Sequence, residues 1–115
     1  MDDFPEFMKR AANRVPSNAQ NTKDIDGCFY EAADGSQMAC WTCRAARESR
    51  KHAHDFDEYM VCVSGEYTVC MNGEQFVLHP GDELLIPAGT EQWGRCTAGT
   101  RTIHAFGGRR IGGGK

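Results

Sequence analysis

Most of this chain consists of short strand-like segments separated by turns that contain glycine or proline. The clearest pair, residues 66–71 and 74–78, flanks Asn72-Gly73, a dipeptide that strongly favours a two-residue β-hairpin. Similar segments recur about every ten residues, a spacing typical of a β-sandwich or barrel. The sequence therefore predicts an all-β fold, with strands at residues 26–33, 37–46, 58–64, 66–71, 74–78, 83–86, 91–96 and 101–106.

The N-terminal region has a different pattern. In residues 4–15, apolar side chains recur at helical spacing, and Pro5 suits the first position of a helix. We expect this short helix to dock through one apolar face and to be followed by a polar linker. The chain thus divides into an N-terminal helix and linker at residues 1–24, a barrel at 25–107 and a flexible glycine-rich tail at 108–115.

Length and charge narrow the class of protein. A chain of 115 residues is long enough for one domain with its own core. The net charge is −3, and the basic residues are scattered among acidic ones, so no basic stripe indicates a nucleic-acid partner. No apolar run approaches the ~18 residues that span a bilayer, and the acidic N-terminus lacks the apolar region of a secretory signal. We expect a cytoplasmic protein without nucleic-acid or membrane partners.

Six cysteines raise the alternative of a disulfide framework. Without a signal peptide, reduced thiols are the expectation. Cys40 and Cys43 have the spacing of a redox or zinc motif, but no second pair of this kind accompanies them. We expect the cysteines to be small apolar residues within strands.

The segment HAHDFDE, residues 52–58, carries two of the four histidines. Residues two apart on a strand point to the same side, so His52 and His54 are able to aim at one point, and Glu58 keeps the same parity. Two histidines and one carboxylate form a facial metal-binding set that leaves positions open for a substrate or oxygen. The alternative is a solvated loop of mixed charge.

These residues belong to a longer pattern that resembles the cupin superfamily. Its first motif, G-x5-HxH-x3,4-E-x6-G, fits His52, His54, Glu58 and Gly65, and its second, G-x5-PxG-x2-H-x3-N, fits Gly81, Pro87 and Gly89. The resemblance implies a jelly-roll β-barrel with a metal inside, commonly as a homodimer. The chain departs from the motifs at Ala46, at Cys96 and at Gln92, which takes the position of the usual histidine ligand.

The resemblance makes Gln92 the fourth member of the metal site, beside His52, His54 and Glu58. Its amide oxygen is a weak neutral ligand, and its NH2 is able instead to hydrogen-bond a metal-bound water. Mn, Fe, Ni and Zn all remain open as the divalent ion, as does a degenerate site that stays empty. An ion with one carboxylate ligand keeps a net positive charge, which favours an anionic chelating ligand such as an enolate or a 2-keto acid.

Four hydrophobic residues and one histidine are candidates for the pocket wall. Thr102 and His104 share a face of the last expected strand, so His104 is a candidate replacement ligand or proton shuttle; the alternative is a histidine whose nitrogens bond to the protein backbone or solvent. His79 lies in a turn and is expected at the surface. The hydrophobic candidates are Phe56, Met60, Trp93 and Phe106.

Two classes of function follow. One is a metal-dependent lyase, isomerase or dioxygenase acting on a small anionic metabolite, in which the metal polarises a substrate oxygen or activates oxygen. Glu91, His104 and Tyr59 are candidates for a general base. The other is a non-catalytic cupin module that binds or senses a metal or small molecule. Residues 59–63 are apolar on both faces, so a second sheet, the N-terminal helix or a partner subunit must cover them. Together with the apolar stripe of residues 4–15, this leads us to expect a homodimer.

Overall fold

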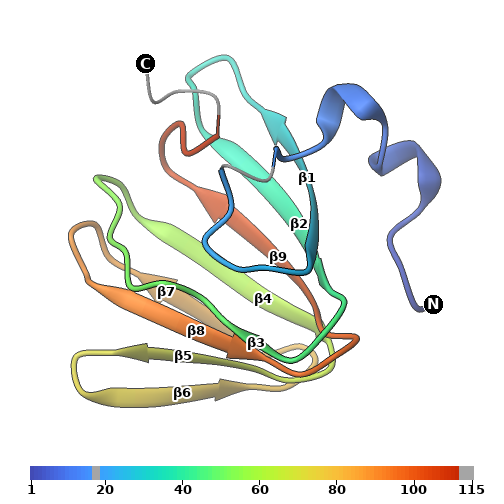
Figure 1. The fold of residues 1–115 in the computed structure, drawn as a ribbon. Helices are drawn as coiled ribbons and strands as arrows, with labels where there is room; N and C mark the ends of the chain where they lie inside the picture. The colour runs from blue at the N-terminus through green and yellow to red at the C-terminus, as the bar shows by residue number, and fades with distance from the viewer. Residues whose placement is uncertain (17–18, 112–115) are drawn as a thin grey trace.

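The computed structural model describes residues 1–16 and 19–111 and consists of two antiparallel sheets that face one another across a hydrophobic interior (Figure 1). One sheet has the strand order β1-β2-β9-β4-β7 and the other the order β3-β8-β5-β6. The expected all-β jelly-roll barrel is confirmed. The strands are β1 Ile25–Glu31, β2 Gln37–Cys43, β3 Arg47–Glu48, β4 Glu58–Ser64, β5 Tyr67–Met71, β6 Glu74–Leu78, β7 Glu83–Ile86, β8 Gln92–Cys96 and β9 Arg101–Phe106.

Turn chemistry places the strands where the sequence predicts them. Asn72 and Gly73 both have positive φ, 54° and 74°, as the tight hairpin between β5 and β6 requires. Gly65, between β4 and β5, has φ 78°, and a side chain there would come within 2.3 Å of the Thr100 hydroxyl. The short β3 was not predicted, because a two-residue strand carries no periodicity.

Alternation along the strands separates the interior from the outer surface. On β4, Met60 and Cys62 are buried in the interior, whereas Tyr59 is exposed on the opposite face. Two apolar clusters fill the barrel, one around Met60, Val69 and Ile86 and the other around Trp41 and Phe106. Buried polar side chains lie beside these clusters: Glu58, Thr102 and His104.

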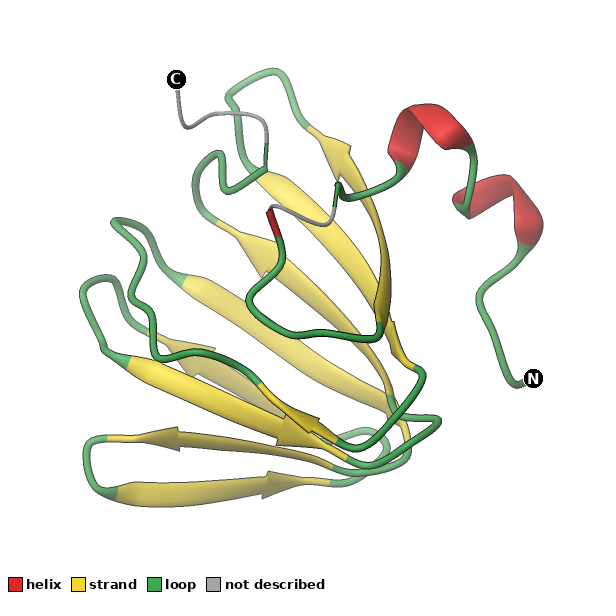
Figure 2. Ribbon diagram, viewed as in Figure 1, coloured by secondary structure: helices red, strands yellow, loops and turns green. Residues whose placement is uncertain are grey.

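The N-terminal helix predicted for residues 4–15 is wrong. The segment forms two isolated 3-10 turns, Glu6–Met8 and Ala11–Asn13, joined through an extended Arg10 (Figure 2). Phe4 packs under the Arg101 guanidinium at one end, and Val15 N–H donates to the Gly27 carbonyl of β1 at the other. These contacts hold the chain more extended than a helix, which advances only about 1.5 Å per residue.

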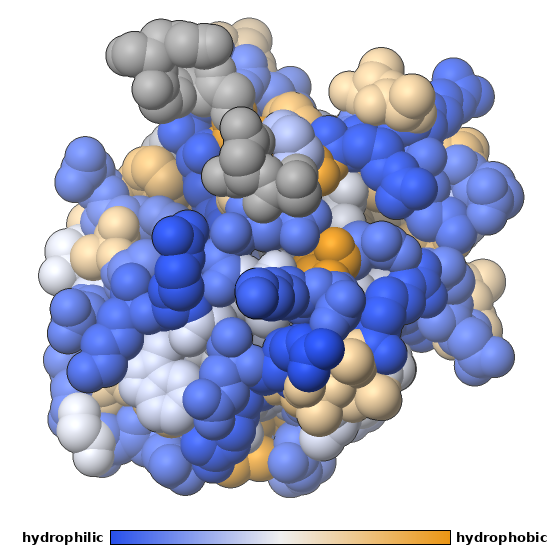
Figure 3. Space-filling view, in the orientation of Figure 1, coloured by the Kyte–Doolittle hydropathy of each residue, from blue (hydrophilic) through white to orange (hydrophobic). Residues whose placement is uncertain are grey.

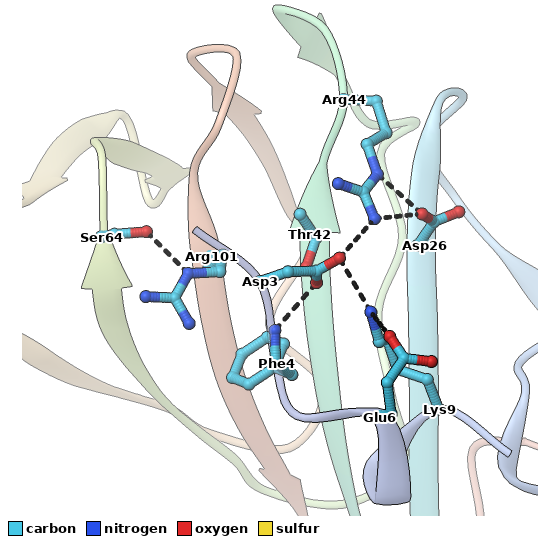
Figure 4. A network of polar contacts seen from close by, with 9 residues as sticks. All are labelled: Asp3, Phe4, Glu6, Lys9, Asp26, Thr42, Arg44, Ser64 and Arg101. Atoms are coloured by element: carbon cyan, nitrogen blue, oxygen red, sulfur yellow. Dashed lines mark hydrogen bonds and ion pairs between the residues drawn. The ribbon is translucent and has the colours of Figure 1, made fainter. Parts of the chain in front are cut away.

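A polar network fixes this segment to the outer side of the sheet (Figure 4). The Asp3 carboxylate accepts hydrogen bonds from Lys9 Nζ at 2.9 Å, Arg44 Nη2 at 3.1 Å and the Phe4 N–H at 2.8 Å. Arg44 also donates to Asp26 of β1 at 2.7 Å. The Lys9 and Arg44 cations and the Phe4 N–H outweigh burial and hold the pKa of Asp3 well below its usual range. An ionised carboxylate therefore contributes to the docking of the segment, together with the contacts of Phe4 and Val15.

The described residues after β9 pack against the barrel, whereas the sequence predicts a flexible tail from residue 108. Ile111 is only 2% exposed and packs with Trp41 and Phe106. The Gln37 side chain accepts hydrogen bonds from the backbone N–H groups of Arg110 and Ile111, at 3.0 and 2.8 Å. Residues 108–111 thus pack against the barrel, and 112–115 lie outside the described residues.

All six cysteines are free thiols and buried, as expected for small apolar residues. Cys40 and Cys43 lie in one strand, and residues three apart there point to opposite faces, which argues against a redox pair. On the face in Figure 3, hydrophilic residues surround small, separate hydrophobic groups. No helix within the described ranges has the length and apolar character needed to cross a membrane.

Candidate functional site

The site is a cavity of about 50 Å³ between the two sheets. The segment before β4 contributes His52 and His54, and β4 contributes Glu58. A second, outer hollow of about 340 Å³ shares His52, His54 and Arg110 with it. The cavity thus reaches from the buried carboxylate to the surface, and its remaining wall includes Trp41, Tyr67, His104 and Phe106.

His52 is held by two backbone bonds to Gln92, which join the first motif to β8. The two residues exchange N–H···O bonds of 2.9 and 2.8 Å. His52 Nδ1 lies 2.8 Å from the carbonyl oxygen of Arg50, so this nitrogen carries the proton and donates it. Burial lowers the pKa of His52, so the ring is neutral at pH 7 and Nε2 carries a lone pair.

His54 has an unsatisfied ring nitrogen in the site. Its ring stacks on Phe56 at 5.1 Å between centroids. Nε2 is buried without a hydrogen-bond partner in the described structure, and it lies 3.5 Å from Glu58 Oε1. Burial lowers the pKa of His54 as well. A buried imidazole nitrogen of this kind is free to accept a metal ion or a ligand proton.

Glu58 has partners at both carboxylate oxygens. Gln92 Nε2 donates to Oε1 at 3.0 Å, and His104 Nδ1 donates to Oε2 at 2.6 Å. His104 Nε2 lies 3.0 Å from the Thr102 hydroxyl. Burial alone would raise the pKa of Glu58, but the bonds from His104 and Gln92 lower it below its usual value. The carboxylate is therefore ionised inside the barrel.

These distances test whether a metal ion fits. Two ligands at about 2.1 Å from one ion and about 90–110° apart lie about 3.0–3.4 Å from each other. The 3.5 Å between His54 Nε2 and Glu58 Oε1 is close to that value, and His52 Nε2 supplies a third lone pair. Within residues 1–16 and 19–111, however, no cluster of three or more His, Cys, Asp or Glu side chains is arranged as a ready metal site. Among the described residues, the His54–Glu58 pair has the spacing of two ligands of one ion, and Gln92 Nε2 donates to the Glu58 oxygen of that pair.

The other sequence candidates fall in different places. Phe106 lines the inner cavity and Phe56 the outer hollow. Met60 lies in the apolar cluster instead of the cavity wall. Trp93 follows the inward-facing Gln92 and so points to the opposite face of β8, where Arg95 lies 5.9 Å from its ring.

The two remaining candidates for a general base lie outside the cavity. Tyr59 is on the outer face of β4 and donates its hydroxyl proton to Glu83 at 2.8 Å. Glu91 is exposed. Neither is positioned to act on a ligand in the barrel.

Several wall residues were missed by the sequence interpretation, among them Tyr67, Trp41 and Arg110. Tyr67 and Trp41 lie on expected strands, at positions with the inward parity of their neighbours, so alternation indicates them. Gly94 leaves room for the Tyr67 hydroxyl, which would lie 2.3 Å from a side chain at that position. Arg110 comes from the segment assigned to the tail, where no periodicity exists to reveal it.

Comparison with known proteins agrees with this architecture. Similar solved structures include an RmlC-like cupin from Shewanella frigidimarina NCIMB 400 (TM-score 0.72, 19% identity, 90% of this chain and 86% of that one). Another is KdgF from Halomonas sp. (TM-score 0.66, 18% identity, 80% of this chain and 89% of that one). A third is a cupin superfamily protein from Desulfitobacterium hafniense DCB-2 (TM-score 0.68, 13% identity, 73% of this chain and 77% of that one). At these identities the likeness concerns the fold alone. A search of curated proteins gave no match.

The family model described as "Cupin domain" matches residues 41–110, which is more than half of the chain and includes both motifs. The strand order, the cavity and this match lead to one conclusion: the chain belongs to the cupin family.

Proposed function

We propose that this cupin binds one divalent metal ion through His52, His54 and Glu58, and a small anionic metabolite against it. The observation that carries the proposal is His54 Nε2, buried without a partner in the described structure and 3.5 Å from Glu58 Oε1. Leaving a buried polar atom unsatisfied costs about 1–3 kcal/mol, so such an atom is typical of a site completed by a ligand.

The surrounding residues support this role. The bond from His52 Nδ1 to the Arg50 carbonyl oxygen fixes the ring so that Nε2 faces the site, a common arrangement around metal-binding histidines. Gln92 would turn its amide so that the oxygen, instead of the NH2, faces the ion. His104 stays bonded to Glu58 Oε2 and is a positioning residue, not a ligand. Mn(II), Fe(II), Ni(II) and Zn(II) all suit this donor set.

A metal-dependent lyase, isomerase or dioxygenase reaction is the proposed activity. When bound, a divalent ion supplies a Lewis acid that polarises a ligand oxygen. Tyr67 lines the cavity, and burial raises its pKa, so its phenol keeps its proton and is able to donate it to that oxygen. Trp41 and Phe106 exclude water from the same space.

A second candidate, a non-catalytic binding module, rests on a different observation. Gln92 and His104 engage both oxygens of Glu58 without any ion. If this arrangement persists in solution, the cavity binds its ligand by hydrogen bonds alone. The metal content of the purified protein distinguishes these two candidate functions.

The experiment is elemental analysis of protein purified without chelators or a metal-affinity resin. The metal proposal expects about one ion per chain in wild-type protein and in His79→Ala, whose histidine is on the surface, and none in His54→Ala. Equal metal content in His54→Ala and wild type would contradict it. A metabolite screen with and without metal then tests for turnover.

The proposed assembly is a homodimer, in the cytoplasm. Exposed apolar residues on the outer face of the five-stranded sheet lie in register, with Tyr30 opposite Met38, Tyr59 opposite Leu85, and Ala105 between the two pairs. With a two-fold axis near Ala105, the Tyr30–Met38 end of the row in one copy would pack against the Tyr59–Leu85 end in the second copy.

A further inference from the structure

The segment after β9 crosses the barrel entrance and is held on both sides of Arg110. Arg109 makes two hydrogen bonds to the Glu31 carboxylate, at 2.9 and 2.8 Å. Gln37 Nε2 donates to the Ile111 carbonyl at 2.8 Å, and Gln37 Oε1 accepts from the N–H groups of Arg110 and Ile111. The backbone of Arg110 is therefore fixed, and its side chain has a defined direction.

That side chain points over the cavity. The guanidinium carbon lies 5.2 Å from the centre of the Trp41 ring and 5.5 Å from that of Phe106. Arg110 lines both the inner cavity and the outer hollow. Its Nη1 is buried, and no acceptor bonds to it within residues 1–16 and 19–111. Two aromatic rings thus orient a planar cation whose Nη1 donates no hydrogen bond to the described residues.

No carboxylate within residues 1–16 and 19–111 forms an ion pair with this cation. The Glu58 carboxylate acts on it electrostatically, but Glu58 is already bonded to His104 and Gln92. Burial lowers the pKa of Arg110, although an arginine remains charged at any physiological pH. Burying a charged donor atom such as Nη1 without an acceptor is costly, so its retention points to a partner supplied from outside.

We propose that Arg110 is the anchor for the carboxylate of a small carboxylic acid, whose other oxygen-bearing end reaches toward His54 and Glu58. The inference rests on the proposed function for the location of the ligand and adds its class. A guanidinium offers two parallel N–H donors that match the two oxygens of a carboxylate. The inner volume of about 50 Å³ and the outer one of about 340 Å³ restrict this acid to a small molecule.

The test uses pyruvate, malonate and glutarate, each beside its uncharged amide, with chelator-treated and Zn(II)-loaded protein. Binding is followed by the NMR resonance of the Arg110 Nε–H group and by titration calorimetry. At least one acid should shift this resonance saturably and bind at least tenfold more tightly than its amide. Absence of binding by all three acids in both protein forms would overturn the proposal, as would equal binding of acids and amides.

Variants assign the effect to Arg110. Arg110→Gln should weaken acid binding tenfold or more, and Arg110→Lys should restore only part of it, because lysine keeps the charge but loses the paired donors. Arg95→Gln, the same charge change on the outer face, should bind as wild type does. Unchanged binding in Arg110→Gln would overturn the anchor. Arg110→Met, which keeps the contact with the rings, tests the same loss if Arg110→Gln does not fold.

Metal content distinguishes this inference from the proposed function. Arg110→Gln should keep the wild-type metal content, because Arg110 is not a ligand. If His54→Ala and wild type have the same metal content, no ion is bound at His54. Acid binding by chelator-treated protein would then still support Arg110 as the anchor. Loss of metal in Arg110→Gln would instead give that residue a role in the metal site and contradict the assignment.

Discussion

His104 Nδ1 lies 2.6 Å from Glu58 Oε2, a contact between residues 46 positions apart in the sequence. β4 and β9 are paired so that Met60 is opposite His104 and Phe106 is opposite Glu58, which makes the two side chains diagonal neighbours inside the barrel. The contact allows a carboxylate to be ionised where burial alone would favour its protonated form. It also orients the carboxylate for whatever binds at Oε1.

Removing this partner should destabilise the protein. In His104→Leu, Glu58 Oε2 is left buried without a donor, and we expect the free energy of unfolding at pH 7 to fall by about 1–3 kcal/mol. His79→Leu is the matched control, because His79 is exposed in a turn, and it should change stability by no more than about 0.5 kcal/mol. Urea denaturation measures both. Equal stability of the two variants would mean that the buried contact contributes little.

Gln92→His should increase metal affinity. Gln92 Nε2 already contacts Glu58 Oε1, so a histidine at this position would present an imidazole nitrogen to the same space. We expect dissociation constants at least tenfold lower, about 1.4 kcal/mol of binding free energy. Competition with a chromophoric chelator measures the change. An unchanged dissociation constant would show that residue 92 does not approach the ion.

The sequence predicts the barrel well because its signals are local. Alternating apolar residues and the Asn72-Gly73 turn define β5 and β6 whatever the rest of the chain does. The prediction for the N-terminal segment fails because its structure is not decided locally. Its periodicity is helical, but contacts of Phe4 and Val15 with distant strands determine its conformation. Tertiary contacts of this kind override a weak local preference.

The site likewise contains residues that local patterns predict and residues that only long-range contacts bring together. His52, His54 and Glu58 come together because a short segment and one strand carry them. The pairing of Glu58 with His104 depends on the register of β4 and β9, which no local pattern specifies. Arg110 follows the last strand, and long-range bonds to Gln37 and between Arg109 and Glu31 hold it over the cavity.

The N-terminal segment should detach in acid. The lowered pKa of Asp3 means that the folded protein binds this proton more weakly than the unfolded chain does, so Asp3 stabilises the fold above a pH of about 4. This contribution disappears as the pH falls through the lower pKa of the folded state. Asp3→Asn should therefore be less stable than wild type at pH 7, and the difference should shrink below about pH 4.

Hydrogen exchange of residues 1–15 as a function of pH tests this directly. Asp2→Asn is the control, because Asp2 is exposed. A difference between Asp3→Asn and wild type that stays constant down to about pH 2 would show that the carboxylate charge is not what holds the segment.

Leu85→Asp should separate the proposed homodimer. Leu85 is 57% exposed and lies at one end of the apolar row on the five-stranded sheet, where a carboxylate would be buried by a second copy. Light scattering at micromolar concentration should give a dimer for wild type and a monomer of 12.8 kDa for the variant. Val77→Asp, exposed on the other sheet, should remain dimeric. A wild-type monomer would refute the dimer.

Anomalous X-ray diffraction from crystals of metal-loaded protein is the most direct test of the central claim. We predict one peak about 2.0–2.3 Å from His52 Nε2, His54 Nε2 and a Glu58 oxygen, with Gln92 Nε2 turned away from that carboxylate and His104 still bonded to its other oxygen. A peak elsewhere in the molecule, or no peak with the Gln92–Glu58 hydrogen bond intact, would contradict it.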